Sequence, residues 1–275
     1  MSAGTAEVRG GPARLPAGGV RLRAFRALCA RDLWVTVRHE PLAFLAQALL
    51  QPIFFLFVFG RVLPEIGAAR GGYGTQLMPG ILGLTLALTS LQNTALPLVI
   101  EFSFTKEIED RLLAPLPVAA VGAQKVVIAA LRAVVAALLI LPLAELILPG
   151  GADLAGASWG AVAGVLILGS LAGGCMGLVL GTAVPPNRIS VTFAIVLTPL
   201  LFTGASFYSW SALSQLRWFQ VVTLFNPLTY VSEGLRASLT ELPHLGGGWI
   251  ALGLCVSLVA FGALGLRGFG RRAVD

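Results

Sequence analysis

Residues 159–184 read WGAVAGVLILGSLAGGCMGLVLGTAV, a run without a single charged side chain. The run lies inside a longer uncharged stretch that extends from Leu154 to Asn187. A helix needs about 20 mostly apolar residues to cross the hydrocarbon core of a bilayer. We therefore predict that this segment is a membrane-spanning helix.

The whole chain of 275 residues shares the apolar character of this run. Residues of the set AVILMFWYC make up 56% of it, charged residues make up only 12%, and the mean hydropathy is +0.86. Soluble domains carry about 25% charged residues, so this chain has too few to cover a surface that faces water. The composition excludes a disordered chain, a disulfide scaffold and nearly any soluble enzyme, and it indicates a polytopic membrane protein.

Five further apolar runs complete the expected topology, an all-α integral membrane protein with six transmembrane helices. The spans are predicted at residues 41–60, 77–100, 126–148, 159–184, 189–207 and 249–266. They form one transmembrane domain, residues 20–268, between a disordered tail at 1–19 and a cytoplasmic tail at 269–275. The first 40 residues hold seven arginines and no apolar core of the length that a cleavable signal peptide needs.

The basic residues indicate the orientation in the membrane. If both termini are cytoplasmic, fourteen of the nineteen Lys and Arg residues fall on inner segments and four on outer ones. Basic residues favour the cytoplasmic side, so we predict a multi-pass protein of a bacterial inner membrane with both termini inside. The basic residues lie at the ends of apolar runs, not along one polar face, so nucleic acid is not expected as a partner.

Residues 20–40 are predicted to form an amphipathic helix on the membrane surface. Apolar side chains recur there at three- and four-residue spacing, at Leu22, Phe25, Cys29, Leu33 and Val37. Such a helix buries its apolar stripe among lipid headgroups and presents basic side chains to anionic lipids. The residues expected at this interface are Arg23, Phe25, Arg31, Trp34 and Arg38. The alternative is a positively charged flank that only stops translocation.

The inner loop at 101–125 contains the sequence EFSFTKEIEDRLLAPLP from Glu101 to Pro117. Thr105 is a suitable cap for a short helix, acids near its start favour it, and Pro115 ends it. A short charged helix with an apolar edge is suited to docking a cytoplasmic protein, although a solvated turn remains the alternative. The candidate docking residues are Lys106, Glu107, Ile108, Asp110, Arg111 and Leu112.

The outer segment at 208–247 is long and rich in aromatic residues, which favour the membrane interface. Asn226 and Pro227 suit the cap and first position of a helix. Within that helix, Glu233 and Arg236 are three residues apart and able to pair. We predict one or two interfacial or re-entrant helices here, with Asn226, Pro227, Tyr230, Glu233 and Arg236 as their motif.

Small residues on the fourth span predict close helix packing. Glycines every four residues line one face of a helix and let another backbone approach it closely. The sequence places them at Gly169, Gly173, Gly177 and Gly181, with a further pair at Gly160 and Gly164. The spacing leaves open whether the neighbouring helix belongs to the same chain or to a second copy.

Two charges, Arg132 and Glu145, lie inside the third predicted span. Arg132 is near the inner edge, where its side chain is expected to extend toward the headgroups, and Glu145 is near the outer edge. They are about 20 Å apart along a helix, too far to pair directly. A role for either in transport stays open.

The chain shows no catalytic constellation. It has no Gly-Lys dipeptide, hence no phosphate-binding loop of the form GxxxxGK[ST], and its two histidines, His39 and His244, are not near any metal-binding pattern. We therefore expect no cofactor on this chain and no enzymatic activity. If the protein moves a substrate uphill, the energy is expected to come from another chain.

In these features the chain resembles the membrane subunit of type-2 ABC transporters, the permeases of drug, polysaccharide and lipo-oligosaccharide exporters. The resemblance rests on the Arg-rich first helix, six spans, the KEIEDRLLAPLP loop from Lys106 to Pro117, and the NPLTY stretch from Asn226 to Tyr230. It covers residues from about Leu22 to Arg271.

This resemblance implies two permease chains, as a homodimer, with two separate ATPase chains that bind ATP and Mg. The helix near residues 106–113 would be the coupling helix that docks on the ATPase, and residues 20–40 would brace it. The substrate would be a drug-like or lipid/glycolipid compound. A self-contained, ion-coupled secondary transporter, and a membrane enzyme or assembly scaffold, are the alternatives.

Overall fold

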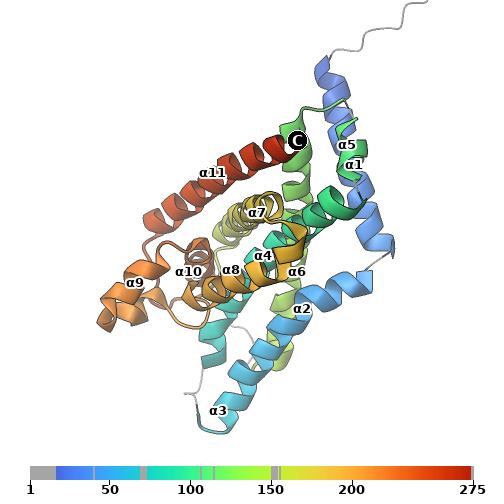
Figure 1. The fold of residues 1–275 in the computed structure, drawn as a ribbon. Coiled ribbons are helices and arrows are strands. Elements are labelled where there is room, and N and C mark those ends of the chain that lie inside the picture. Colours follow the sequence, from blue (N-terminus) through green and yellow to red (C-terminus); the bar gives the residue numbers. More distant parts are fainter. Residues whose placement is uncertain are drawn as a thin grey trace, which may run out of the picture.

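A computed structural model describes residues 17–39, 41–68, 73–105, 107–113, 115–149, 154 and 156–273. Within these ranges every regular element is helical, and six helices are long and apolar enough to cross a membrane (Figure 1). The prediction of an all-α membrane protein with six spans is confirmed. Most of the predicted N-terminal tail, Lys106 and the last two residues lie outside the described part of the chain.

The first half of the chain carries the N-terminal helix α1 and the first two spans. Its elements are α1 (Ala17–His39), α2 (Pro41–Phe57), a π-helical turn (Val58–Val62), α3 (Leu63–Glu65), α4 (Tyr73–Ile100), a second π-helical turn (Glu101–Thr105) and α5 (Glu107–Leu112).

The second half carries the remaining four spans and the short helices between α8 and α11. Its elements are α6 (Val118–Ile147), α7 (Trp159–Ala183), a 3₁₀ turn (Pro186–Arg188), α8 (Ile189–Thr203), a 3₁₀ helix (Trp210–Gln215), α9 (Arg217–Thr223), α10 (Pro227–Leu239) and α11 (Gly247–Arg272).

Span boundaries differ from the predicted ones where a charge or a turn has an unexpected environment. Helix α6 begins at Val118, not at 126, because Lys125 is buried within it beside Glu101. Helix α8 ends at Thr203, not at 207, because Ala205 has a left-handed backbone with φ of 51°. The last span continues through Arg267 to Arg272, beyond the predicted end at 266.

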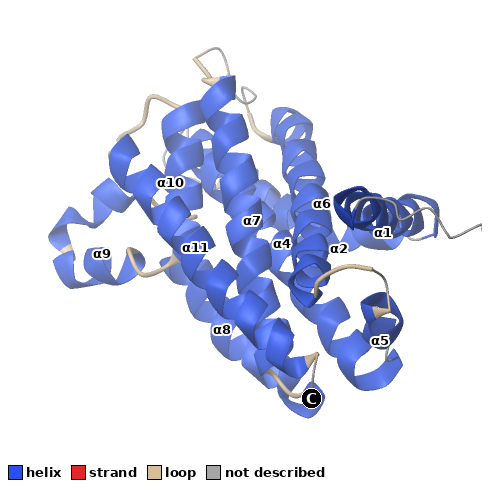
Figure 2. Cartoon of the chain, turned by 90° about the horizontal axis from the view of Figure 1, so that it is seen from above, coloured by secondary structure: helices blue, strands red, loops and turns tan. Residues whose placement is uncertain are grey.

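Helix α4 forms the centre of the bundle. It packs against α7, α6, α10 and α2, and 72% of its most apolar window is buried. The corresponding buried shares are 17% for α2 and 6% for α8, so these two spans lie at the margin of the molecule. Figure 2 shows α1 beside α6 on one side of the bundle and α9 on the opposite side.

The glycines of α7 allow α4 to approach it closely. Three glycines spaced four residues apart face backbone carbonyl oxygens of α4: Gly173 faces Ala87, Gly177 faces Leu91 and Gly181 faces Ala95. A Cβ at Gly173 or Gly181 would lie 3.0 Å from the facing oxygen, tighter than ordinary contact. The neighbour of this face is therefore a helix of the same chain.

The other glycines of α7 have different surroundings. Gly169 faces Val231 of α10, and a Cβ there would lie 2.9 Å from the valine side chain. Gly160 and Gly164 have no neighbouring heavy atom within 4 Å of such a Cβ. The close packing is thus confined to the part of α7 that begins at Gly169.

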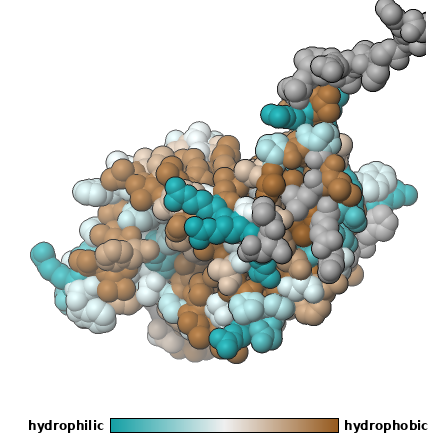
Figure 3. All heavy atoms as spheres, turned by 45° about the horizontal axis from the view of Figure 1, so that its top comes forward, coloured by the Kyte–Doolittle hydropathy of each residue, from teal (hydrophilic) through white to brown (hydrophobic). Residues whose placement is uncertain are grey.

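The outer surface suits a lipid environment. Figure 3 shows one face of the molecule, on which apolar side chains predominate and polar ones form small groups. Large apolar side chains such as Leu42 (79% exposed), Val191 (63%) and Val259 (70%) point away from the bundle on spans α2, α8 and α11. Such side chains would be unfavourable in water but are the expected lining of a surface within a bilayer.

Candidate functional site

Helix α5 is fastened to α1 by one residue of each helix. The Arg111 guanidinium donates hydrogen bonds to both carboxylate oxygens of Asp32, and each N–O distance is 3.0 Å. The two side chains are only 6% and 11% exposed. Bidentate pairs of this kind fix orientation as well as distance. The pair therefore fixes the position of α5 relative to α1. The two helices lie on the same side of the bundle in Figures 1 and 2.

A third donor reaches the same carboxylate from α6. The amide of Gln124 donates to Asp32 at 2.9 Å. Burial by itself would raise the pKa of Asp32, but the hydrogen bonds from Arg111 and Gln124 and the charges of Lys125 and Arg111 outweigh it, so the pKa lies below its ordinary value. Asp32 is therefore ionised at neutral pH and joins three helices.

A second ion pair continues this cluster toward α4. Lys125 of α6 donates to Glu101, which begins the π-helical turn after α4. Glu101 also lies 3.8 Å from Arg111. Both carboxylates thus share the positive charge of Arg111, and four elements meet at one polar cluster formed by Asp32, Glu101, Arg111, Gln124 and Lys125.

Arg132 was expected to extend toward lipid headgroups, but its partners are protein groups. Its guanidinium donates to the Thr36 hydroxyl and, at 3.4 Å, to the Asp32 carbonyl, both on α1. It also donates to the Asn93 side chain of α4 at 3.3 Å. Arg132 therefore links α1 to two spans, while Glu145 is exposed near the other end of α6.

Helix α5 has one buried face and one exposed face. Ile108 is only 3% exposed and packs in an apolar cluster with residues of α4, α6, α7 and α11. Glu107 and Asp110 are exposed, and Leu113 just after the helix is 84% exposed. The predicted docking residues thus separate: Ile108 and Arg111 face the protein, whereas the two acids face outward. The side chain of Leu112 is outside the description.

The predicted interface residues lie mostly on the outside of α1. Arg23, Arg31, Trp34 and Arg38 are exposed, and Phe25 is half-buried. The Arg38 guanidinium lies 5.3 Å from the centre of the Trp34 ring, an arrangement that favours a cation–π contact. The opposite side of α1 carries Asp32 and Thr36, so the helix has one side bound to the bundle and another that is free.

The predicted outer motif forms a capped helix. The Asn226 side chain accepts a hydrogen bond from the Leu228 amide at 2.9 Å, and Pro227 occupies the first turn of α10. Asn226 also donates to the Leu200 carbonyl of α8 at 2.8 Å. The Tyr230 hydroxyl donates to the Leu224 carbonyl at 2.7 Å. These contacts fix the start of α10 against α8 and α9.

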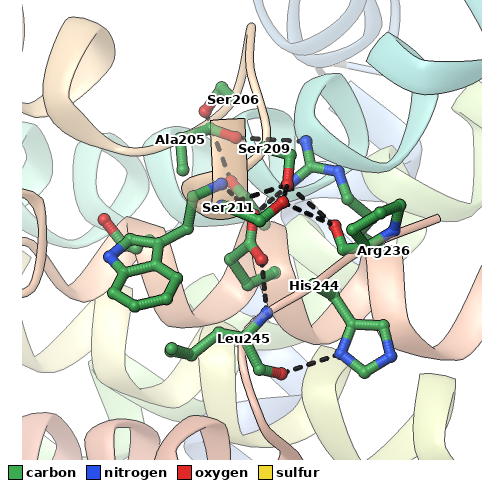
Figure 4. Close-up of polar contacts among 12 residues, drawn as sticks. Ala205, Ser206, Ser209, Ser211, Arg236, His244 and Leu245 are labelled. Carbon is green, nitrogen blue, oxygen red and sulfur yellow. Dashed lines mark hydrogen bonds and ion pairs between the residues drawn. The ribbon is translucent and has the colours of Figure 1, made fainter. Parts of the chain in front are cut away.

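Glu233 and Arg236 form a fully buried ion pair in the middle of α10. Their side chains are 0% and 2% exposed. Glu233 also accepts hydrogen bonds from the backbone amides of Trp210 at 2.9 Å and Leu245 at 2.7 Å. Arg236 donates to the carbonyl of Ala205 at 3.2 Å (Figure 4). The pair thus connects α10 to the turn at Ala205, to the backbone at Trp210 and to the segment that precedes α11.

Sequence reasoning missed four residues of the polar cluster that joins α5 to α1: Asp32, Glu101, Gln124 and Lys125. Glu101 and Lys125 are predicted only as the ends of the inner loop at 101–125, and Asp32 lies within the helix predicted at 20–40 without a role of its own. One signal was present: Asp32 is the one acidic residue between Arg9 and Glu40. A single acid on an Arg-rich helix suggests a specific partner, although the sequence does not say which one.

Comparison with known proteins gives two findings. The family model described as "ABC-2 type transporter" matches residues 23–240, from α1 to the end of α10. The inner membrane transport permease YadH of Escherichia coli K12 is 26% identical over 213 residues, which cover 75% of this chain and 80% of that protein. The permease of the same name from Shigella flexneri has the same identity and coverage.

Proposed function

The chain belongs to the ABC-2 type transporter family, and on that premise we propose that it forms the translocation path of an ATP-driven exporter for a drug-like or lipid/glycolipid substrate. It is a multi-pass permease subunit of the inner membrane. The membrane domain of this family lacks an ATPase site, so ATP and Mg belong to the separate ATPase subunits with which such permeases work.

The proposal gives α5 the role of the coupling helix. One observation supports this role. The Arg111–Asp32 pair fixes the buried side of α5 to α1, while Glu107 and Asp110 remain exposed on its other side. A short helix that is fixed to the bundle and presents acids outward is suited to transmitting the motion of a docked protein. Lys106 precedes this surface in the sequence, and α1 braces it.

The proposed complex contains two permease copies and two ATPase chains, with both permease termini in the cytoplasm. The distribution of Lys and Arg supports this orientation. The low buried shares of α2 and α8, 17% and 6%, support a second copy, because both spans have faces that a partner can cover.

Charge reversal on the exposed face of α5 tests this function. In the complex with its ATPase, Glu107→Lys with Asp110→Lys should lower the ATP hydrolysis that the permease stimulates at least about tenfold, because like charges or lost pairs at a docking surface weaken binding. Membrane insertion and the melting temperature should stay unchanged, because both side chains are exposed.

The matched control reverses two exposed acids elsewhere, Glu65→Lys with Glu241→Lys, which changes the net charge equally. This control should leave ATP hydrolysis near the wild-type rate. Unchanged hydrolysis in the α5 variant would refute the coupling role. Transport that follows the proton gradient without any ATPase would instead support the secondary-transporter alternative.

A further inference from the structure

A small polar hollow lies between α2 and α4, in the membrane-spanning part of the chain. Its cavity volume is about 20 Å³, which leaves room for about one water molecule or one hydroxyl group. Most of its polar groups are side-chain amides and hydroxyls. The lining residues are Gln47, Ala48, Gln51, Pro52, Leu84, Thr85, Leu88, Thr89 and Gln92.

The glutamines of α2 lie deep enough to be in the hydrocarbon region. Gln47 and Gln51 are one helical turn apart, about 9 and 15 Å along the axis from Pro41, at 1.5 Å per residue. Both are exposed at the surface of the single chain. Polar side chains at such depth normally face a bundle interior or a water-filled cavity, because bare contact with lipid is unfavourable.

Some of the polar groups around this hollow already have hydrogen bonds within the ranges that the structure describes, and the glutamine amides have none there. In the part of the chain that the structure describes, the Thr85 hydroxyl donates to the Ile81 carbonyl at 2.8 Å, and the Thr89 carbonyl accepts from the Asn93 amide at 2.8 Å. No hydrogen bond among the described residues joins the side chains of Gln47, Gln51 and Gln92. These amides are therefore available to donate to and accept from an incoming group.

The backbone of α2 adds an acceptor at the same place. Pro52 lacks an N–H, so it cannot donate the usual helical hydrogen bond to the carbonyl of Ala48. Both residues line the hollow and are buried. The site thus offers neutral amide donors and both amide and carbonyl acceptors, and its lining contains no charged side chain.

From this chemistry, and resting on the proposed permease function, we propose that Gln47, Gln51 and Gln92 bind an uncharged hydrogen-bonding group of the transported amphiphile. A hydroxyl, carbonyl or amide group can both donate to and accept from these side chains. An ionised group would be buried there without a counter-charge, which is strongly unfavourable. The three glutamines therefore select against charge at this point of the path.

The hollow suits a small group better than the flat face of another helix. Its floor is recessed, because Thr85 and Thr89 are only 3% and 6% exposed, whereas Gln47 and Gln51 stand at its rim. A hydroxyl group at the end of a flexible chain can enter such a recess. The backbone of a helix from a second copy is too wide to enter it, because the recess has room for only about one hydroxyl group.

Photolabelling of the permease alone in nanodiscs tests this site. The probe is octyl glucoside with a diazirine in its alkyl chain, and the competitors are unlabelled octyl glucoside and octyl sulfate. We expect labelling of the peptides around Gln47–Gln51 and Gln92, with octyl glucoside competing at a concentration at least about tenfold lower than octyl sulfate. The triple variant Gln47→Leu/Gln51→Leu/Gln92→Leu should lose at least about nine-tenths of the competed labelling.

Two controls keep the result specific. Gln76→Leu removes an exposed glutamine of α4 outside the hollow and should label like the wild type. Gln51→Asn keeps the amide but shortens its reach, and it should retain more competed labelling than Gln51→Leu. Leucine is compatible with a membrane-facing helix at the exposed Gln47, Gln51 and Gln76 and at the half-buried Gln92. Size-exclusion chromatography of the nanodiscs checks incorporation.

Equal competition by the charged and uncharged detergents would overturn the proposal, as would wild-type labelling of the triple variant. Near-complete disulfide dimerisation of Gln51→Cys, with Cys29, Cys175 and Cys255 changed to Ala, would assign the face to a second copy and overturn it as well. Because labelling needs neither ATP nor the ATPase, failed transport with intact labelling would count against the proposed function and leave the site standing.

Discussion

Arg111 and Asp32 are 79 residues apart in the sequence, yet their side chains meet through two N–O contacts of 3.0 Å each. Gln124 shares the same carboxylate from α6. The N-terminal helix α1, the short helix α5 and the span α6 are therefore joined at one point. A force applied to α5 reaches a span directly through this contact.

Removing the buried arginine should loosen α5. Arg111→Ala leaves Asp32 buried without its main partner, which costs about 3 kcal/mol. We expect hydrogen–deuterium exchange of the α5 amides to become about 100-fold faster. Arg61→Ala is the matched control, because its pair with Glu65 is 50% and 63% exposed and should contribute less than about 1 kcal/mol. Similar effects of the two variants would contradict the structural role of the buried pair.

The stabilisation from Asp32 should depend on pH only in acid. The pKa of Asp32 in the folded protein lies below its ordinary value, so its contribution is complete above the unfolded pKa of about 3.9 and is lost as the pH falls through the folded pKa. The difference in melting temperature between wild type and Asp32→Asn should thus be constant from about pH 5 to pH 8 and shrink below about pH 4. A difference that shrinks already between pH 7 and pH 5 would show that another group is responsible.

Adding one methyl group to α7 should lower stability at positions that face α4 but not at positions that face open space. In Gly177→Ala the new Cβ would overlap the Leu91 carbonyl, which cannot move without shifting α4, so a loss of about 1–3 kcal/mol is expected. Gly164→Ala meets no heavy atom within 4 Å and should be neutral or slightly stabilising. Thermal unfolding in detergent measures both, and an equal loss in the two variants would rule out close α4–α7 packing as the cause.

The Glu233–Arg236 pair should be more sensitive to single than to double replacement. Arg236→Met leaves the Glu233 carboxylate buried without its positive partner and should destabilise by about 3–5 kcal/mol. Arg236→Met with Glu233→Gln removes both charges and should recover part of that loss, since the amide oxygen of Gln still accepts from the Trp210 or Leu245 backbone. Limited proteolysis of residues 205–245 reports the effect, and a double variant worse than the single one would speak against a buried ion pair.

The proposed orientation predicts opposite labelling of two exposed positions. In a background with the three native cysteines changed to Ala, Gln215→Cys in the outer segment should react with an impermeant maleimide in spheroplasts, whereas Asp110→Cys should react only after permeabilisation. Both side chains are exposed, so access depends on the side of the membrane. Labelling of Asp110→Cys in intact spheroplasts would place α5 outside and end its assignment as a coupling helix.

The sequence predicted the architecture because its signals are local. Six apolar runs, the Asn226–Pro227 helix start and the three-residue spacing of Glu233 and Arg236 each lie within one short segment, and the structure contains the corresponding spans, cap and ion pair. The predicted ends of the spans were less accurate. A charged residue such as Lys125 is tolerated inside a helix when a partner such as Glu101 neutralises it.

The polar cluster around Asp32 and the hollow lined by glutamines could not be predicted from local sequence signals. Each depends on side chains from different helices, such as Asp32 with Arg111, or Gln51 with Gln92. Composition and periodicity describe each helix separately, so they give no indication of which polar residues meet. Arg132 shows the same limit: its depth suggested an interaction with lipid, while its partners are on α1 and α4.

The contact of α1, α5 and α6 at Asp32 also limits how this protein can be engineered. A chimera that takes its first helix from a relative would replace the acceptor while keeping the donors Arg111 and Gln124 of the recipient. Such a chimera should fold stably only when the residues at positions 32 and 111 are taken from the same parent, because the ion pair needs both of its partners.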